Sequence, residues 1–88
     1  MWTIKFSESV LRKDVKNLPK DVLRRLRTKL DGVRDDPFRY LVRLTNLPYY
    51  KLRVGDYRVI FAVDSEAKVL RVLMIDYRRR ICKRLWKS

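Results

Sequence analysis

The chain has 88 residues, of which 23 are Lys or Arg and 10 are Asp or Glu, so its formal net charge is +13. It contains no histidine and one cysteine, Cys82, which excludes Ser-His-Asp and Cys-His hydrolases, disulfide frameworks and metal sites built on imidazole or several thiolates. A chain of this length forms one domain, here residues 1–88, and its 47% hydrophobic content is that of a globular protein rather than a disordered basic tail.

The N-terminal part predicts one strand followed by two helices. Residues 2–6 alternate, which places Trp2, Ile4 and Phe6 on one face of a short strand. Ser7 can then cap a helix, whose apolar stripe consists of Leu11, Val15 and Leu18. Pro19 suits the first turn of a second helix, and Asp35-Asp36-Pro37 ends it. That helix buries the residues at helical spacing, Val22, Leu26, Leu30 and Val33.

From residue 50 the apolar period changes to two, which predicts three consecutive strands. They cover residues 50–54, 57–63 and 68–75, with turns at Gly55-Asp56 and at residues 64–67. Residues 76–88 are predicted to form a loop and a short basic helix or tail. The resulting order is β-α-α-β-β-β-α. This is an α+β fold in which two helices pack on one face of a small, mainly antiparallel sheet.

The two-residue turn at Gly55-Asp56 fixes the register of the first hairpin. Val54 pairs with Tyr57, and Arg53 lies opposite Arg58, because directly opposed residues share a face. The core face then carries Tyr50, Leu52, Val54, Tyr57, Val59 and Phe61. The other face carries Lys51, Arg53 and Arg58, together with Ile60 and Ala62.

The cations on this second face lack nearby acidic residues in the sequence. Arg53 opposite Arg58 is unfavourable by a few tenths to about 1 kcal/mol, and Asp56 is the only acid between Asp36 and Asp64. One explanation is a solvated basic face on a charge-rich protein. The other is an anion site, most naturally for phosphodiesters.

The C-terminal stretch adds a second group of cations, in which Arg outnumbers Lys. Arginine favours bidentate contact with phosphate and stacking on bases. Tyr49 and Tyr77 lie near these cations in sequence and are candidates for stacking on single-stranded nucleic acid, or are plain structural tyrosines. The cations are Arg78, Arg79, Arg80, Lys83, Arg84 and Lys87.

The central and C-terminal residues together resemble the RelE/ParE toxin superfamily. The resemblance covers nearly the whole chain and rests on Asp36-Pro37, Leu44, the stretch of residues 50–61 that contains RVGDYRVIF, and the tail of residues 77–82. It implies a small toxin encoded beside an antitoxin. RelE-like members are metal-independent endoribonucleases that cut mRNA in the ribosomal A site, whereas ParE-like members share the fold and act on DNA gyrase.

The resemblance assigns roles to individual residues. Lys51, Arg58 and Arg78 match active-site positions of RelE-like enzymes, and Arg53 matches a commonly basic position beside them. Other residues expected to contact RNA are Tyr49, Tyr77, Arg79 and Arg80. The resemblance further implies an acidic, RelB-like antitoxin bound in a hetero-oligomer, contact with mRNA and the ribosome, and no metal, cofactor or membrane.

Two residues depart from the family pattern. The closing motif is commonly a His-Arg pair followed three residues later by a hydrophobic residue and Tyr, whereas this chain has Tyr77 and Cys82 at the His and Tyr positions. Both positions help proton transfer or hold substrate in some members. Cleavage is therefore expected to be slower or carried mainly by the cations. A lone Cys without His is otherwise expected to be a small buried hydrophobe.

The departures leave other functions open: a ParE-like gyrase poison, a non-catalytic toxin-fold protein held by its antitoxin, or plain DNA or RNA binding without a helix-turn-helix. The N-terminal MWTIKF is too short and too mixed for an export segment, and no window approaches the roughly 18 apolar residues of a membrane span. With its single thiol, the chain is expected to be cytoplasmic.

Overall fold

The structure is a computed structural model that describes residues 1–86, so Lys87 of the predicted basic tail lies outside the described range. Its sheet has the strand order β1-β5-β4-β3-β2, with β1 parallel to β5 and the other pairs antiparallel. The strands are β1 (Thr3–Phe6), β2 (Val42–Arg43), β3 (Tyr50–Val54), β4 (Tyr57–Asp64) and β5 (Val69–Tyr77). The helical elements are η1 (Val10–Asp14), η2 (Val15–Asn17), α1 (Lys20–Asp35), α2 (Pro37–Tyr40) and α3 (Arg78–Trp86).

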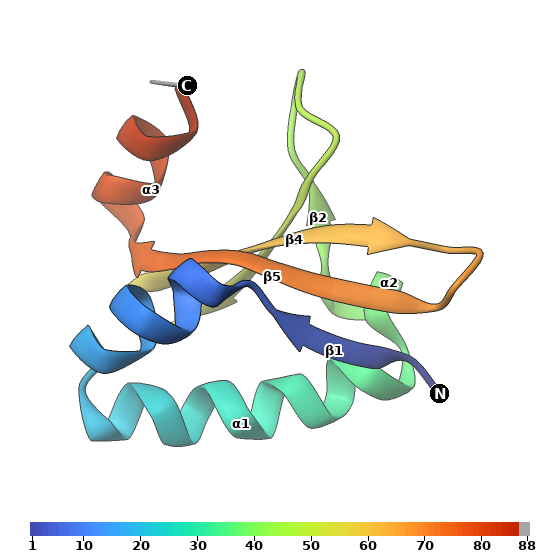
Figure 1. The fold of residues 1–88 in the computed structure, drawn as a ribbon, viewed down its shortest axis with the longest axis horizontal. Helices are drawn as coiled ribbons and strands as arrows, with labels where there is room; N and C mark the ends of the chain where they lie inside the picture. The colour runs from blue at the N-terminus through green and yellow to red at the C-terminus, as the bar shows by residue number, and fades with distance from the viewer. Residues whose placement is uncertain (87–88) are drawn as a thin grey trace.

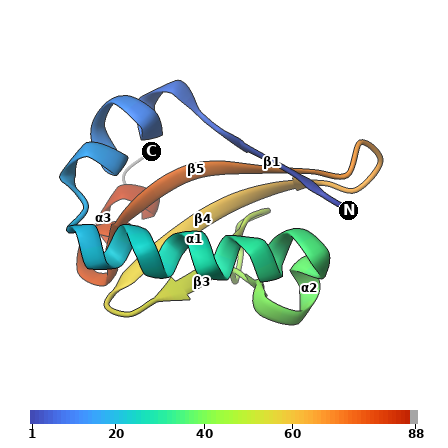
Figure 2. The same cartoon turned by 90° about the horizontal axis from the view of Figure 1, so that it is seen from below.

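The predicted α+β class is confirmed, with α1 lying along one face of the sheet (Figures 1 and 2). Leu26, Leu30 and Val33 of α1 are buried at their predicted helical spacing and pack with buried residues of β3, β4 and β5. Two short elements, α2 and β2, are additions to the predicted order. Both lie between α1 and β3, in a stretch too short to show a period.

The first helical segment differs from the prediction in which side chains it buries. Ser7 does accept a bond from the Val10 N–H through its Oγ, at 3.4 Å. Of the predicted stripe, Leu18 is buried and Val15 packs against the core, but Leu11 is exposed. Val10 and Asp14 are buried in addition. The cause is η1, a π-helical turn, because the extra residue in such a turn shifts the inward face away from the ordinary helical positions.

The β3–β4 hairpin has the predicted register, with Val54 paired to Tyr57 and Arg53 paired to Arg58. Gly55 takes the left-handed conformation, with φ at 59°, which glycine adopts at little cost. Leu52, Val54, Val59 and Phe61 are buried on the core face, as expected. A bulge between Ile60 and Phe61 interrupts the pairing of β4 with β5.

The second face of the sheet is partly covered, which the sequence did not predict. The strand β5 continues through Tyr77, and α3 begins directly at Arg78, so the expected loop at residue 76 does not exist. The helix α3 folds back over this face, where Ile60 and Ile81 are buried. No helix in residues 1–86 is long and apolar enough to cross a membrane.

A basic groove between α3 and the β2–β3 loop

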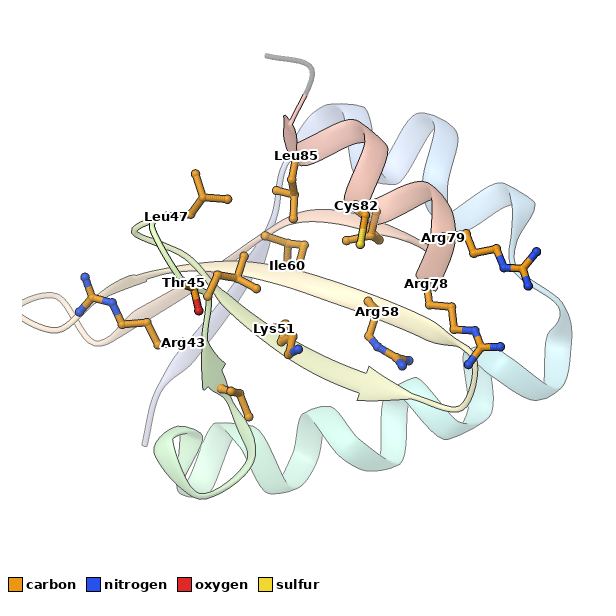
Figure 3. Close-up of a pocket in the computed structure, with 13 residues that line it drawn as sticks. Arg43, Thr45, Leu47, Lys51, Arg58, Ile60, Arg78, Arg79, Cys82 and Leu85 are labelled. Carbon is orange, nitrogen blue, oxygen red and sulfur yellow. The ribbon is translucent and has the colours of Figure 1, made fainter.

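A groove of about 620 Å³ lies on the sheet face opposite α1. Ile60 of β4 forms its floor, α3 contributes Ile81 and Leu85, and the β2–β3 loop contributes Leu44 and Leu47. Figure 3 shows the loop and α3 rising on either side of the strands. The groove therefore exists because α3 returns over the sheet without covering all of it.

The structure brings the three predicted catalytic residues together at this groove. Lys51 comes from β3, Arg58 from β4 and Arg78 from the first turn of α3, and all three line it. Arg58 and Arg78 point the same way, with Lys51 beside them on the neighbouring strand (Figure 3). Arg79 also lines the groove, and its side chain projects from α3 away from the middle of the groove (Figure 3). The β3–β4 hairpin and the later helix α3 thus present their cations to one surface.

The β3–β4 turn holds both arginines in place. Nη1 of Arg58 donates to the carbonyl oxygens of Gly55, at 3.0 Å, and of Tyr57, at 2.9 Å. The Arg78 N–H donates to the Asp56 carbonyl oxygen at 2.9 Å. A guanidinium has five N–H donors, so Nε and Nη2 of Arg58 remain available for an anion. The turn therefore fixes the half-buried Arg58 without neutralising it.

No acidic side chain among the described residues forms an ion pair with Lys51, Arg58 or Arg78. The described lining of the groove likewise includes no carboxylate. Asp76, the strand partner of Arg58, is instead paired with Arg84, at 3.1 Å, and more distantly with Arg80. The cations of the groove therefore attract anions from outside the described chain.

Arg84 anchors α3 rather than adding to the basic surface. Its Nη1 lies 3.2 Å from Oδ1 of the buried Asp14 and 3.1 Å from Oδ2 of Asp76. The other Asp14 oxygen accepts the Ile75 N–H at 2.9 Å. These bonds join η1, β5 and α3, so they set the distance between α3 and the sheet and with it one wall of the groove.

Four residues predicted to contact RNA lie outside the described lining of the groove. Tyr77 packs edge-on against Tyr57, with ring centroids 5.7 Å apart, and lines a separate small cavity with Arg80. Tyr49 closes the β2–β3 loop, its carbonyl oxygen accepting the Leu44 N–H. Arg53 is exposed on the same strand face as Lys51, next to the groove.

Cys82 is exposed and lines the groove, which corrects the expectation of a buried hydrophobe. It lies four residues after Arg78, so both project from one side of α3. The position at which the family resemblance expects a tyrosine therefore faces the cationic cluster. The position at which it expects a histidine, Tyr77, does not.

Sequence reasoning missed the contribution of the β2–β3 loop. Arg43, Thr45 and Leu47 line the groove, with the Arg43 guanidinium pointing away from the other cations (Figure 3). Asn46 has a positive φ of 64°, a conformation in which Asn is enriched. The Asn-Leu-Pro stretch at residues 46–48 is thus a turn signal, but nothing in it indicates which face the loop covers.

The comparisons with known proteins agree with this geometry. A family model described as "ParE toxin of type II toxin-antitoxin system, parDE" matches residues 4–82. The chain is similar in structure to the archaeal RelE-RelB complex from Pyrococcus horikoshii OT3, with 29% identity, a TM-score of 0.75 and coverage of 90% of this chain and 97% of that one. It is also similar to the intact E. coli RelBE toxin-antitoxin complex, with 28% identity, a TM-score of 0.73 and coverage of 88% and 96%. No curated protein sequence gives a significant match.

Proposed function

The chain belongs to the ParE toxin family of type II toxin–antitoxin systems, within the RelE/ParE superfamily, and from this premise we propose that it is an endoribonuclease that cuts mRNA on the ribosome. The observation that carries the proposal is the cluster of Lys51, Arg58 and Arg78 in one groove, without a carboxylate partner among residues 1–86. These are the residues that the family resemblance assigns to cleavage.

The proposed reaction is an in-line attack of an RNA 2′-hydroxyl on the adjacent phosphorus. The bond from O2′ to phosphorus forms, the bond from phosphorus to O5′ breaks, the 2′-hydroxyl loses its proton and O5′ gains one. The products are a 2′,3′-cyclic phosphate and a 5′-hydroxyl. Negative charge develops on the non-bridging oxygens in the transition state, where fixed cations stabilise it most.

Arg58 and Arg78 are suited to this stabilisation. A guanidinium stays protonated and can bind two oxygens of one phosphate. The turn carbonyls that hold Nη1 of Arg58 orient its free donors before substrate binds, which reduces the reorganisation required during reaction. The described lining presents cations and no carboxylate, and the proposal assigns the stabilisation of the developing negative charge to these two side chains.

Lys51 is assigned to proton transfer or to transition-state charge. Unlike Arg, a lysine side chain can give up its proton, and Lys51 is exposed at the groove, where a nucleotide can reach it. Without a histidine, general acid–base catalysis is weak, and the cleavage rate is expected to be lower by a factor of about 10²–10⁴. Positioning of the mRNA by the ribosome would then supply much of the rate.

The test is primer extension on an mRNA under translation. Arg58→Ala and Arg78→Ala are each expected to reduce cleavage by about 10²–10³, the usual effect of removing one charge-stabilising donor. Arg27→Ala, which removes an exposed cation from α1 on the other side of the sheet, is the matched control and should cut normally. Undiminished cleavage by both groove variants would contradict the assignment.

A ParE-like action on DNA gyrase is the second candidate. Two observations favour it: the matching family model carries the ParE name, and Tyr77 and Cys82 replace residues that help cleavage in some RelE-like members. A supercoiling assay beside the primer-extension assay separates the two. Inhibition of gyrase with intact mRNA would establish the second candidate.

An antitoxin partner is part of the proposal. Similar solved structures are toxin–antitoxin complexes, and the +13 net charge of this chain favours an acidic partner. The proposed partner is a RelB-like protein that binds over the basic groove and blocks it. Co-expression of the reading frame next to this one, followed by co-purification, tests the pairing.

A further inference from the structure

A second cationic patch lies on the same sheet face as the groove, toward the β1 edge. Lys5 of β1 and Arg71 of β5 are direct partners in the parallel pairing, so their side chains share a face. Both are exposed and line a shallow depression of about 340 Å³, together with Ala62. Neither forms an ion pair among residues 1–86.

The depression and the groove are neighbours along β4. Ile60 lines the groove and Ala62 lines the depression, and residues two apart on a strand point to the same face about 7 Å apart. In Figure 1 the β4–β5 hairpin extends away from α3, and no helix lies over its upper face. The β2–β3 loop rises from the sheet between α3 and the end of this hairpin (Figure 1), so a partner that extends from the groove into the patch passes beside this loop.

Placing Lys5 beside Arg71 is unfavourable for the free protein. Like charges directly opposite one another destabilise a sheet. Asp64 also lines the depression, but its Oδ1 accepts the Ala67 N–H at 3.1 Å, and it is not ion-paired with either cation. Asp64 offsets only one of the two positive charges, so the patch keeps a net positive charge.

The two cationic sites are too far apart to share one phosphate. From Arg58 to Ala62 is four residues, or about 13 Å, and Arg71 lies one strand further, about 5 Å to the side, which gives a separation of about 14 Å between the Arg58 and Arg71 backbones. The Arg58 guanidinium is bonded to the Gly55 carbonyl oxygen, at the end of β4 away from Ala62 and Arg71, so the side chains do not close this distance. An anion that both sites bind is therefore one with repeated charges. An RNA chain, the substrate class of the proposed function, has this property.

We propose that Lys5 and Arg71 form an accessory binding site for the RNA sugar–phosphate backbone, outside the phosphodiester that is cut. The identification of the polyanion as RNA rests on the proposed function, whereas the site itself rests on the geometry above. The backbone can belong to the mRNA that flanks the cut or to ribosomal RNA, because both present the same phosphates. The site strengthens binding and takes no part in bond breakage.

The experiment compares two variants of equal charge. Lys5→Gln/Arg71→Gln removes the patch, and Lys16→Gln/Arg27→Gln removes one exposed Lys and one exposed Arg from the helical elements. Binding to vacant ribosomes and to a single-stranded RNA oligonucleotide is measured across a range of KCl concentrations. Melting temperatures of both variants verify that they fold.

The patch variant is expected to bind about tenfold more weakly near physiological salt. Its slope of log affinity against log salt should be smaller in magnitude by about 1.4 for a single strand, or about 1.8 for a duplex, because two phosphate contacts are lost. Its melting temperature should stay the same or rise, since a repulsive pair is removed. The control variant should retain the parental slope.

A changed slope on the oligonucleotide assigns the site to flanking mRNA, and a change on vacant ribosomes alone assigns it to ribosomal RNA. The proposal is overturned if neither slope changes, if the control variant loses as much as the patch variant, or if the parent protein binds neither probe. These readouts need no cleavage. Failure of the proposed nuclease would instead appear as absent cutting in primer extension, while the patch variant still shows a smaller salt slope than the parent.

Discussion

Asp14 connects three elements through one carboxylate. It lies in a helical turn among apolar neighbours and is buried, yet both oxygens are bonded: one accepts the Ile75 N–H and the other meets Arg84 of α3. Ile75 lies beyond the stretch of β5 that pairs with β1. Without Asp14, the Ile75 N–H would have no partner at that edge of the sheet. Asp14 therefore both completes the hydrogen bonding of β5 and holds α3 through Arg84.

Asp14→Ala is therefore expected to lower the free energy of unfolding by roughly 1–3 kcal/mol, the effect of leaving a buried N–H without its acceptor. The Arg84 contact adds little, because that side chain is partly exposed. Asp14→Asn should lose less stability, since its amide oxygen can still accept a hydrogen bond from the Ile75 N–H. Urea unfolding measures both. Equal urea midpoints for Asp14→Ala and the parent would contradict this account.

Cys82 offers a test of the family pattern at a single position. It faces the cationic groove from α3, where the resemblance expects a tyrosine. Cys82→Tyr supplies an aromatic ring for base stacking and a hydroxyl near the phosphate. It should raise cleavage in primer extension about tenfold, less than the factor of about 10²–10⁴ that a positioned general acid or base supplies. Cys82→Ala is the control and should cut as the parent does. Loss of cleavage in Cys82→Ala would instead reveal a direct role for the thiol.

At the scale of elements, the β3–β4 hairpin was predictable because two independent signals agree on it. The alternation of residues 50–54 and 57–63 defines the faces, and the Gly55-Asp56 turn defines the register. Together these two signals are sufficient to place Lys51 and Arg58 on one surface. The same turn then fixes the start of α3, since the Asp56 carbonyl oxygen accepts the Arg78 N–H.

The remaining walls of the groove were not predictable because nothing local determines them. The strand β2 has two residues. The sequence of the loop after it indicates a turn but does not indicate which face of the sheet the loop covers. The start of α3 is a run of three arginines with no apolar period, so its sequence is also typical of a solvated tail. The side it covers depends on contacts distant in sequence, such as Arg84 with Asp14. For the same reason Tyr77 and Arg80, close to Arg78 in sequence, lie around a different cavity.

Gly55→Ala tests whether the turn positions Arg58. The substitution forces a Cβ onto a residue with φ at 59°, and that atom would lie 3.2 Å from a guanidinium nitrogen of Arg25, which is flexible enough to move. The strain is expected to lower stability by about 1 kcal/mol. Because the Gly55 carbonyl oxygen binds Nη1 of Arg58, cleavage in primer extension should fall as well.

The matched variant is Gly55→Asn, since Asn tolerates the left-handed conformation better than Ala. Gly55→Asn should recover most of the stability, measured by urea unfolding, and most of the mRNA cleavage, measured by primer extension, that Gly55→Ala loses. Full cleavage in Gly55→Ala at conditions where it is folded would indicate that Arg58 does not depend on the turn. Lost cleavage in Gly55→Asn despite recovered stability would indicate a role for the glycine beyond its backbone conformation.

At the scale of the whole molecule, one face of the sheet carries cations that form no ion pair among residues 1–86. The sheet face opposite α1 carries Lys51, Arg53 and Arg58 near one end and Lys5 with Arg71 near the other. The acids on this face are Asp76, which is already paired, and Asp64. Such a surface weakens the folded state by self-repulsion and is suited to a polyanion or an acidic protein.

This imbalance predicts opposite effects of salt on the free toxin and on its complex. Chloride from about 20 to 300 mM shortens the Debye length to below about 10 Å, which screens repulsion within the +13 chain. The melting temperature of the free toxin should therefore rise. The same screening weakens attraction to an acidic antitoxin, so the dissociation constant of the complex should increase over this range.

The measurements are differential scanning calorimetry of the free toxin and titration of the antitoxin at each salt concentration. The variant Lys5→Gln/Arg71→Gln serves as the internal comparison: its melting temperature should depend less on salt than that of the parent, because one repulsive pair is gone. A melting temperature that falls as chloride is added would mean that attractive ion pairs dominate the free protein. The basic sheet face would then be electrostatically satisfied within the monomer, contrary to the unpaired cations on which both the groove and the patch depend.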